Sequence, residues 1–150
     1  MFDKYIANPA AKILEAGCGL GGWVNYFYLK KFQVVGLEID DELVQQVKRY
    51  NSKIPVEKGD IFNIHYPDSH FDAYISLGVI EHFEEGPIAA LREANRVLKN
   101  GGLAFITVPY LNIFRKLFPE KNDFGRGTVH SLFQSQKTFG NRRGFIFCHR

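Results

Sequence analysis

Cysteine, methionine and tryptophan are scarce in this chain of 150 residues, which holds two Cys, one Met and one Trp. Cys18 lies within a run of glycines, where a crosslink to Cys148 would obstruct a ligand loop, so we expect reduced thiols and a cytoplasmic location.

Long apolar runs are also missing. No stretch approaches the ~20 apolar residues of a membrane span, and residues 1–9 lack the apolar core of a signal peptide.

Acidic residues are missing from one part of the chain. The formal net charge is only +3, yet the residues after 123 include five basic side chains and no acidic one: Arg126, Lys137, Arg142, Arg143 and Arg150. Five cations over this length are fewer than a dedicated nucleic-acid surface carries, so nucleic acid is a disfavoured partner. We expect a core domain over residues 1–123 and a basic, Phe-containing tail over 124–150.

Short apolar runs alternate with segments of helical spacing. The predicted strands are 12–16, 33–38, 56–60 (the weakest), 71–77 and 103–108, and the predicted helices are 22–31, 41–50 and 86–99. In the last helix, Ile88, Leu91, Ala94 and Leu98 share one face. Buried strands that alternate with crossover helices predict an α/β fold with a mostly parallel sheet.

A glycine-rich loop joins the first predicted strand to the first helix, where glycines let a ligand approach the backbone amides. Gly17, Gly19 and Gly22 also fit the spacing of a dinucleotide-binding loop, with an acidic residue about 20 positions on. Glu15 favours a cationic ligand over a dinucleotide, because a carboxylate at the strand tip repels a pyrophosphate and attracts a positive charge. A carboxylate that caps nearby amides is the alternative for Glu15.

Two acidic residues follow the second predicted strand. Glu38 ends that strand, where its two oxygens can accept from both hydroxyls of a ribose, which favours a nucleoside ligand. An ordinary surface carboxylate is the alternative. Asp40 directly precedes the helix over 41–50, so we predict that it is the N-cap.

Five segments resemble motifs of one family. Residues 13–21 (ILEAGCGLG) resemble the first motif of class I S-adenosylmethionine-dependent methyltransferases, and residues 36–38 (GLE) resemble the second. Similarity continues at 59–61 (GDI), at 76–83 (SLGVIEHF) and at 98–102 (LKNGG), the turn before strand five. The resemblance covers about residues 12–109. It implies a Rossmann-like three-layer sandwich, S-adenosylmethionine as the cofactor and S-adenosylhomocysteine as the product.

The resemblance also implies roles for single residues. The cofactor-binding residues would be Glu15, Gly17, Cys18, Gly19, Gly21, Glu38, Ile39, Asp60, Ile61 and Leu77. Asp60 would accept a hydrogen bond from the adenine amine, Ile61 would pack on the ring, and the Leu77 backbone would meet the methionine portion. A turn aspartate and a core isoleucine are the alternatives for Asp60 and Ile61.

The sequence departs from the family in two places. The Asn/Asp-Pro-Pro-Tyr motif of enzymes that methylate planar amino groups is missing, so the pattern resembles the small-molecule, methyltransferase type 11-like branch. After Pro109 only 41 residues remain, where the family builds a helix and two strands, the last of them antiparallel. We therefore expect C-terminal strands that are incomplete or degenerate, in a fragment or decayed copy that is truncated at both ends. Their remnant would be residues 133–134, 137, 139 and 144–146. An open sheet edge of this kind predicts a homodimer.

His82 is the candidate general base, because it follows the fourth strand at the edge where such sheets bind ligands, and an imidazole can take a proton from the acceptor. Packing or capping of the following turn is an equally good interpretation. No metal site is expected, because no second Cys or His lies at ligand spacing. A non-catalytic cofactor-binding or interaction module is the alternative function, and an NAD(P)-binding oxidoreductase domain is a weaker one.

Overall fold

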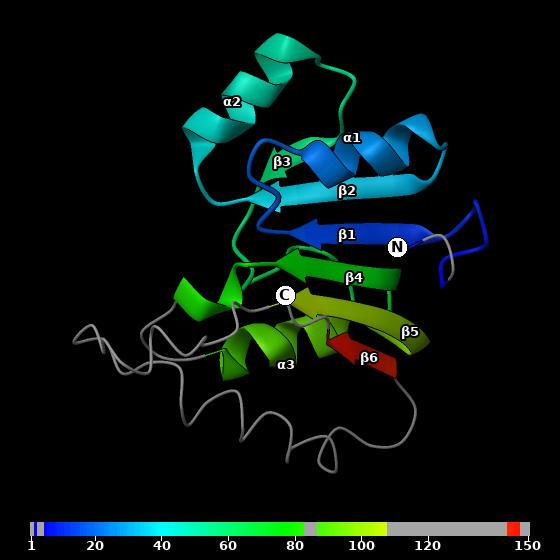
Figure 1. The fold of residues 1–150 in the computed structure, drawn as a ribbon. Coiled ribbons are helices and arrows are strands. Elements are labelled where there is room, and N and C mark those ends of the chain that lie inside the picture. The colour runs from blue at the N-terminus through cyan, green and yellow to red at the C-terminus, as the bar shows by residue number, and fades with distance from the viewer. Residues whose placement is uncertain (1, 3–4, 83–86, 108–143, 148–150) are drawn as a thin grey trace, which may run out of the picture.

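One parallel sheet organises the molecule. The computed structural model describes residues 2, 5–82, 87–107 and 144–147. Six strands lie in the order β3-β2-β1-β4-β5-β6 (Figure 1), and each neighbouring pair is parallel. Their bounds are β1 Lys12–Ala16, β2 Gln33–Glu38, β3 Val56–Lys58, β4 Phe71–Leu77, β5 Leu98–Thr107 and β6 Gly144–Phe147. The predicted α/β class is confirmed.

Helices cover both faces of this sheet, as Figure 1 shows. Helices α1 (Gly22–Leu29) and α2 (Asp41–Tyr50) bury Val24, Phe27, Val44 and Val47 in one hydrophobic cluster. Helix α3 (Ile88–Val97) contributes to a second cluster with Leu14, Leu37 and Tyr74 from the strands. Sheet and helices together make the three-layer sandwich that the sequence predicted.

Helix α2 has the N-cap, the end charges and the buried face that its sequence predicts. The Asp40 carboxylate accepts a hydrogen bond of 2.8 Å from the Glu42 backbone N–H, which confirms it as the N-cap. Acidic residues occupy the first turn and basic residues the last, in the sense that the helix dipole favours. Val44 and Val47, one turn apart, face the sheet.

The boundary between α3 and β5 differs from the prediction. The helix ends at Val97 instead of Lys99, and Leu98 begins β5 instead of continuing the helical face. Within the segment 98–102, predicted as a turn, Leu98 pairs with Phe71 of β4, but residues 99–102 interrupt the pairing, and the next pair joins Ala73 to Leu103. The extra residues fit because Gly101 adopts φ +81°, a conformation that glycine tolerates.

Three smaller differences concern α1, β3 and α3. Helix α1 ends at Leu29 instead of Lys31, whose positive φ of 68° is incompatible with a continuing helix. Strand β3 covers 56–58 instead of 56–60. In α3 the buried face consists of Ala90, Leu91, Ala94 and Val97, while Ile88 is 40% exposed.

The strand order places a crevice at the centre of the sheet. Strand β1 pairs with β2 on one side and with β4 on the other, so the loops after β1 and β4 leave the sheet in opposite directions. In open parallel sheets this point, at the carboxyl ends of the strands, is where ligands bind.

The C-terminal end of the sheet is partly described. Strand β6 pairs parallel to β5, with Phe105 opposite Ile146, whereas the resemblance implied an antiparallel last strand. The rest of the basic tail, 124–143 and 148–150, lies outside the described residues. Within the described part of the chain, no helix has the length and apolarity to cross a membrane.

Candidate functional site

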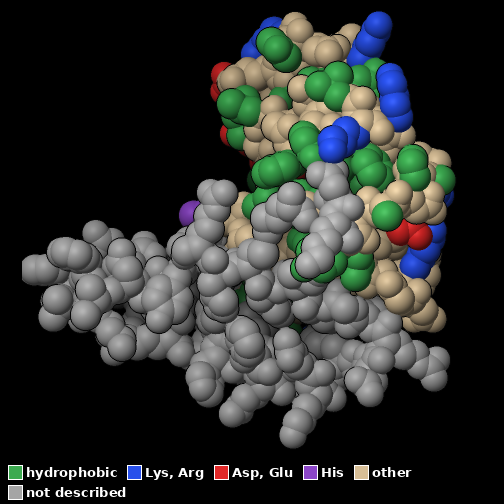
Figure 2. Space-filling model, turned by 45° about the vertical axis from the view of Figure 1, so that its right-hand side comes forward, with side chains coloured by type: hydrophobic (Ala, Val, Ile, Leu, Met, Phe, Trp, Pro, Cys, Tyr) green, Lys and Arg blue, Asp and Glu red, His purple; other side chains and the backbone are tan. Residues whose placement is uncertain are grey.

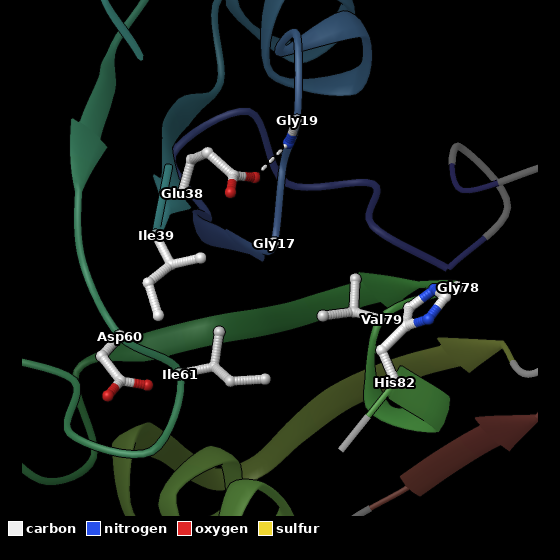
Figure 3. A pocket seen from close by; sticks show the side chains of 9 residues that line it. All are labelled: Gly17, Gly19, Glu38, Ile39, Asp60, Ile61, Gly78, Val79 and His82. Atoms are coloured by element: carbon white, nitrogen blue, oxygen red, sulfur yellow. Dashed lines mark hydrogen bonds between the residues drawn. The ribbon is translucent and has the colours of Figure 1, made fainter. Parts of the chain in front are cut away.

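A pocket opens at the predicted crevice. Its volume is about 500 Å³, which includes open solvent at its mouth. The residues that line it come from the loops after β1, β2, β3 and β4 (Figure 3): Gly17, Gly19, Glu38, Ile39, Asp60, Ile61, Gly78, Val79 and His82. Six of the ten predicted cofactor-binding residues and the candidate base therefore line one cavity.

The glycine loop presents backbone to this pocket. Gly17 and Gly19 have φ values of +76° and +54°, which other residues adopt only with strain. The N–H groups of Gly17 and Cys18 both donate to the Leu37 carbonyl at 2.9 Å, so the loop is held against β2. A Cβ added at Gly19 would meet no protein atom within 4 Å, which leaves room for a ligand directly over the loop.

Glu38 links the glycine loop to the end of β2. Its side chain is 8% exposed; one oxygen accepts from the Gly19 N–H at 2.7 Å (Figure 3), and the other accepts from the Asp40 N–H at 3.1 Å. A carboxylate has about four acceptor positions, so two remain for ligand hydroxyls. The carboxylate is thus fixed in place where it lines the pocket.

Asp60 and two isoleucines form the opposite wall. The Asp60 carboxylate accepts from the Phe62 N–H at 2.8 Å, so it has the turn role that was the alternative at this position, and it also lines the pocket. Ile61 is 6% exposed, while Ile39 keeps 63% of its surface exposed. Apolar side chains beside a few polar groups are what a purine site requires.

Glu15 lies behind the glycine loop and does not line the pocket. It is 4% exposed, accepts from the Val24 backbone N–H, and its other oxygen has no hydrogen-bond partner. Burial raises the pKa of this carboxyl to about 7. The structure therefore shows the capping role, since the carboxylate holds the first turn of α1, while the cofactor role of Glu15 stays a prediction.

Three other predicted cofactor residues also lie outside the pocket lining. Cys18 is buried, and burial together with the charges of Glu15 and Glu38 raises the pKa of its thiol to about 12. Gly21 faces the core, because an added Cβ would lie 3.1 Å from Cγ2 of Val56. Leu77 is half-buried at the end of β4.

The segment after β4 supplies the third wall. His82 ends the short 3-10 helix η2 (Ile80–His82), is exposed, and its backbone N–H donates to the Val79 carbonyl at 3.2 Å. Gly78 and Val79 also line the pocket but were not among the predicted site residues. They carry no functional group, and only their place in the SLGVIEHF motif could have indicated them.

The charge of the pocket favours a cation. Among the lining residues that the structure describes, none is Lys or Arg, and two are carboxylates, Glu38 and Asp60. Against these described side chains a phosphate group would meet repulsion and no cation, whereas a positive centre would be attracted. The residues therefore fit the nucleoside sulfonium S-adenosylmethionine better than a dinucleotide. Within the described residues no group of three His, Cys, Asp or Glu could hold a metal ion.

Known proteins are similar to this chain in sequence. A family model described as a methyltransferase domain matches residues 14–106. Phosphoethanolamine N-methyltransferase 1 of Arabidopsis thaliana is 30% identical over 70% of this chain and 22% of its own length. A human protein named "Probable tRNA methyltransferase 9B" is 32% identical over 91% of this chain and 30% of its own length. The chain thus spans less than a third of either relative.

Solved structures agree with the fold. The PH0226 protein of Pyrococcus horikoshii has a TM-score of 0.62 and 28% identity, over 67% of this chain and 50% of that one. A SAM-dependent methyltransferase of Archaeoglobus fulgidus has a TM-score of 0.73 at 17% identity, over 93% and 65% of the two chains. With the family match, the parallel sheet and the pocket at its centre, the chain belongs to the class I S-adenosylmethionine-dependent methyltransferases.

Proposed function

We propose that this domain binds S-adenosylmethionine and transfers its methyl group to a small-molecule acceptor by in-line displacement. The observation that carries the proposal is the pocket itself: glycine backbone, two carboxylates and two isoleucines converge at the switch point of the sheet, and the lining in the described part of the chain includes no Lys or Arg. A nucleoside with a positive centre and no phosphate matches that combination.

Each wall has a part in this function. Glu38 accepts from the ribose hydroxyls, while Asp60 and the isoleucines Ile39 and Ile61 hold the adenine. The open space over Gly19 admits the chain that bears the sulfonium. Glu15, buried behind the loop with one unused oxygen, adds negative potential near the positive centre when it is ionised, above its raised pKa of about 7. This carboxylate acts through the field and not through contact, because it does not line the pocket.

The chemistry needs little from the protein beyond position. When bound, the cofactor supplies a methyl group on a positive sulfur, and the acceptor lone pair forms the new bond as the carbon–sulfur bond breaks and its electrons leave with S-adenosylhomocysteine. Holding the reactants in line and excluding water accounts for most of the acceleration. His82, whose imidazole reaches the pocket from η2 (Figure 3), takes the proton that the acceptor releases.

Calorimetry on the purified chain tests the binding step. We expect S-adenosylmethionine and S-adenosylhomocysteine to bind with micromolar dissociation constants and NAD+ to bind at least 100-fold more weakly, a difference of about 2.7 kcal/mol. Tighter binding of NAD+ would overturn the proposal in favour of an oxidoreductase domain.

Transfer of labelled methyl groups to a panel of amines, phenols and carboxylic acids tests the chemistry. We expect S-adenosylhomocysteine and a methylated acceptor in equal amounts. Cofactor binding without transfer to any acceptor would instead support the non-catalytic module.

A tRNA nucleoside is a second candidate acceptor. The human relative, named as a tRNA methyltransferase, matches over 91% of this chain, whereas the Arabidopsis phosphoethanolamine enzyme matches over 70%. The same labelled cofactor, offered with total tRNA and with the small-molecule panel in one mixture, separates the two. Label in the precipitated RNA favours the tRNA, and label in the soluble fraction favours the small molecule.

Two further expectations accompany the proposal. The cytoplasmic location inferred from the scarce cysteines stays a prediction; Cys18 is free and buried. A homodimer through an open sheet edge also stays a prediction. In the described sheet one edge is β3, whose three residues end in the exposed Lys58, and sedimentation of the purified chain measures the assembly state.

A further inference from the structure

Val79 and Gly17 come from distant parts of the chain and meet in the pocket wall. A Cβ built on Gly17 would lie 2.6 and 2.7 Å from the two Cγ atoms of Val79 and 3.2 Å from its Cβ. Because all three carbons of this branched side chain crowd the same point, rotation about its χ1 angle cannot clear the space. The isopropyl group of Val79 therefore sits directly against the Cα of Gly17.

Backbone hydrogen bonds extend this contact on both sides. Gly17 is fixed to β2 through its N–H bond to the Leu37 carbonyl, and Val79 accepts the backbone N–H of His82. The residue before Val79 is held to β5, since the Gly78 N–H donates to the Thr107 carbonyl at 3.0 Å. A displacement of Val79 must therefore move the turn that carries the candidate base.

We propose that Val79 is a positioning residue that locks the glycine loop to the η2 turn, so that the position of the cofactor-binding loop fixes the position of His82. This inference rests on the proposed function, in which the loop holds the cofactor and His82 faces the acceptor. It also gives a second reason for glycine at position 17 besides its φ of +76°: a methyl group there would collide with Val79.

A double-mutant cycle tests the lock. The dissociation constant of S-adenosylhomocysteine is measured by calorimetry for wild type, Gly17→Ala, Val79→Ala and the double variant. We expect Gly17→Ala to weaken binding at least tenfold, and adding Val79→Ala to recover at least threefold of that loss, because the smaller side chain makes room. Losses that simply multiply would overturn the proposal, because independent sites are additive.

Gly101→Ala is the matched control for backbone strain. Gly101 has a similar φ of +81°, but an added Cβ there meets nothing within 4 Å. It lies in β5, outside the pocket lining. The loss of thermal stability in Gly101→Ala measures the strain of alanine in the left-handed region, without a collision between the added methyl group and another side chain. We expect Gly17→Ala to lose more stability than Gly101→Ala, and Val79→Ala to remove the excess.

A ligand-free measurement keeps the two proposals separable. The imidazole resonances of His82, assigned by their loss in His82→Asn, report the position of the η2 turn in NMR spectra. We expect Val79→Ala to shift them, Val79→Thr to restore them because threonine keeps the branched shape, and Gly101→Ala to leave them in place. Unchanged His82 resonances in Val79→Ala would refute the lock. Failure of the wild type to bind S-adenosylhomocysteine would refute the proposed function alone.

Discussion

Replacement of Glu38 by alanine removes the carboxylate that joins the glycine loop to the pocket. Two hydrogen bonds are lost at once, from the Gly19 N–H at 2.7 Å and from the Asp40 N–H at 3.1 Å. Hydrogen bonds to a charged group contribute about 1.5 to 3 kcal/mol each, less where water replaces the partner. We expect the free energy of unfolding to fall by about 1 to 3 kcal/mol.

Cofactor affinity should fall as well, because the ribose hydroxyls lose their acceptor and the loop loses its anchor. A loss of about 1 to 3 kcal/mol corresponds to a dissociation constant about 5 to 150 times larger. Calorimetry with S-adenosylhomocysteine measures this loss, and chemical denaturation separately measures stability.

Two variants control for charge and shape. Glu42→Ala removes an exposed carboxylate from the first turn of α2, outside the pocket, so we expect affinity to change less than about twofold. Glu38→Gln keeps one acceptor oxygen and should fall between wild type and Glu38→Ala. A folded Glu38→Ala protein with wild-type affinity would refute the ribose assignment.

Three other changes test the remaining parts of the site. Gly19→Arg should abolish S-adenosylhomocysteine binding in calorimetry by filling the space over the loop, while Gly19→Ala, with the same backbone strain, should retain measurable binding; equal losses would contradict this explanation. His82→Asn should lower kcat about 100-fold or more and affect S-adenosylhomocysteine affinity much less; an unchanged kcat would exclude His82 as the base. Burial raises the pKa of Glu15 from 4.5 to about 7, so the native state keeps a proton that the unfolded state releases, and stability should fall by about 1 to 3 kcal/mol as pH rises from 4.5 to 7. Denaturation of Glu15→Gln across this range should lack that loss, and parallel pH profiles would refute it.

Most elements and their order along the chain could be predicted from local sequence patterns. Strands β1, β2 and β4 begin and end at the predicted residues, because each is a short apolar run bounded by residues that favour turns. The glycine run before α1 and the N-cap at Asp40 could also be predicted, since each depends only on residues that are close to it in the sequence. Alternation of these elements was enough to predict a parallel sheet and the edge at which its ligand site lies.

Packing between distant segments sets which residues of the glycine loop face the pocket and which face the core. Gly17 and Gly19 line the pocket, whereas Gly21 faces Val56 and Glu15 is buried behind the loop. The contact of Val79 with Gly17 was likewise invisible, because it joins segments about 60 positions apart through shape alone. The end of α3 was mispredicted for the same reason: Leu98 fits a helical face in the local pattern, but pairing with Phe71 of β4 places it in the sheet. Local patterns fix which elements form, and packing between distant segments fixes which side of each residue meets the ligand.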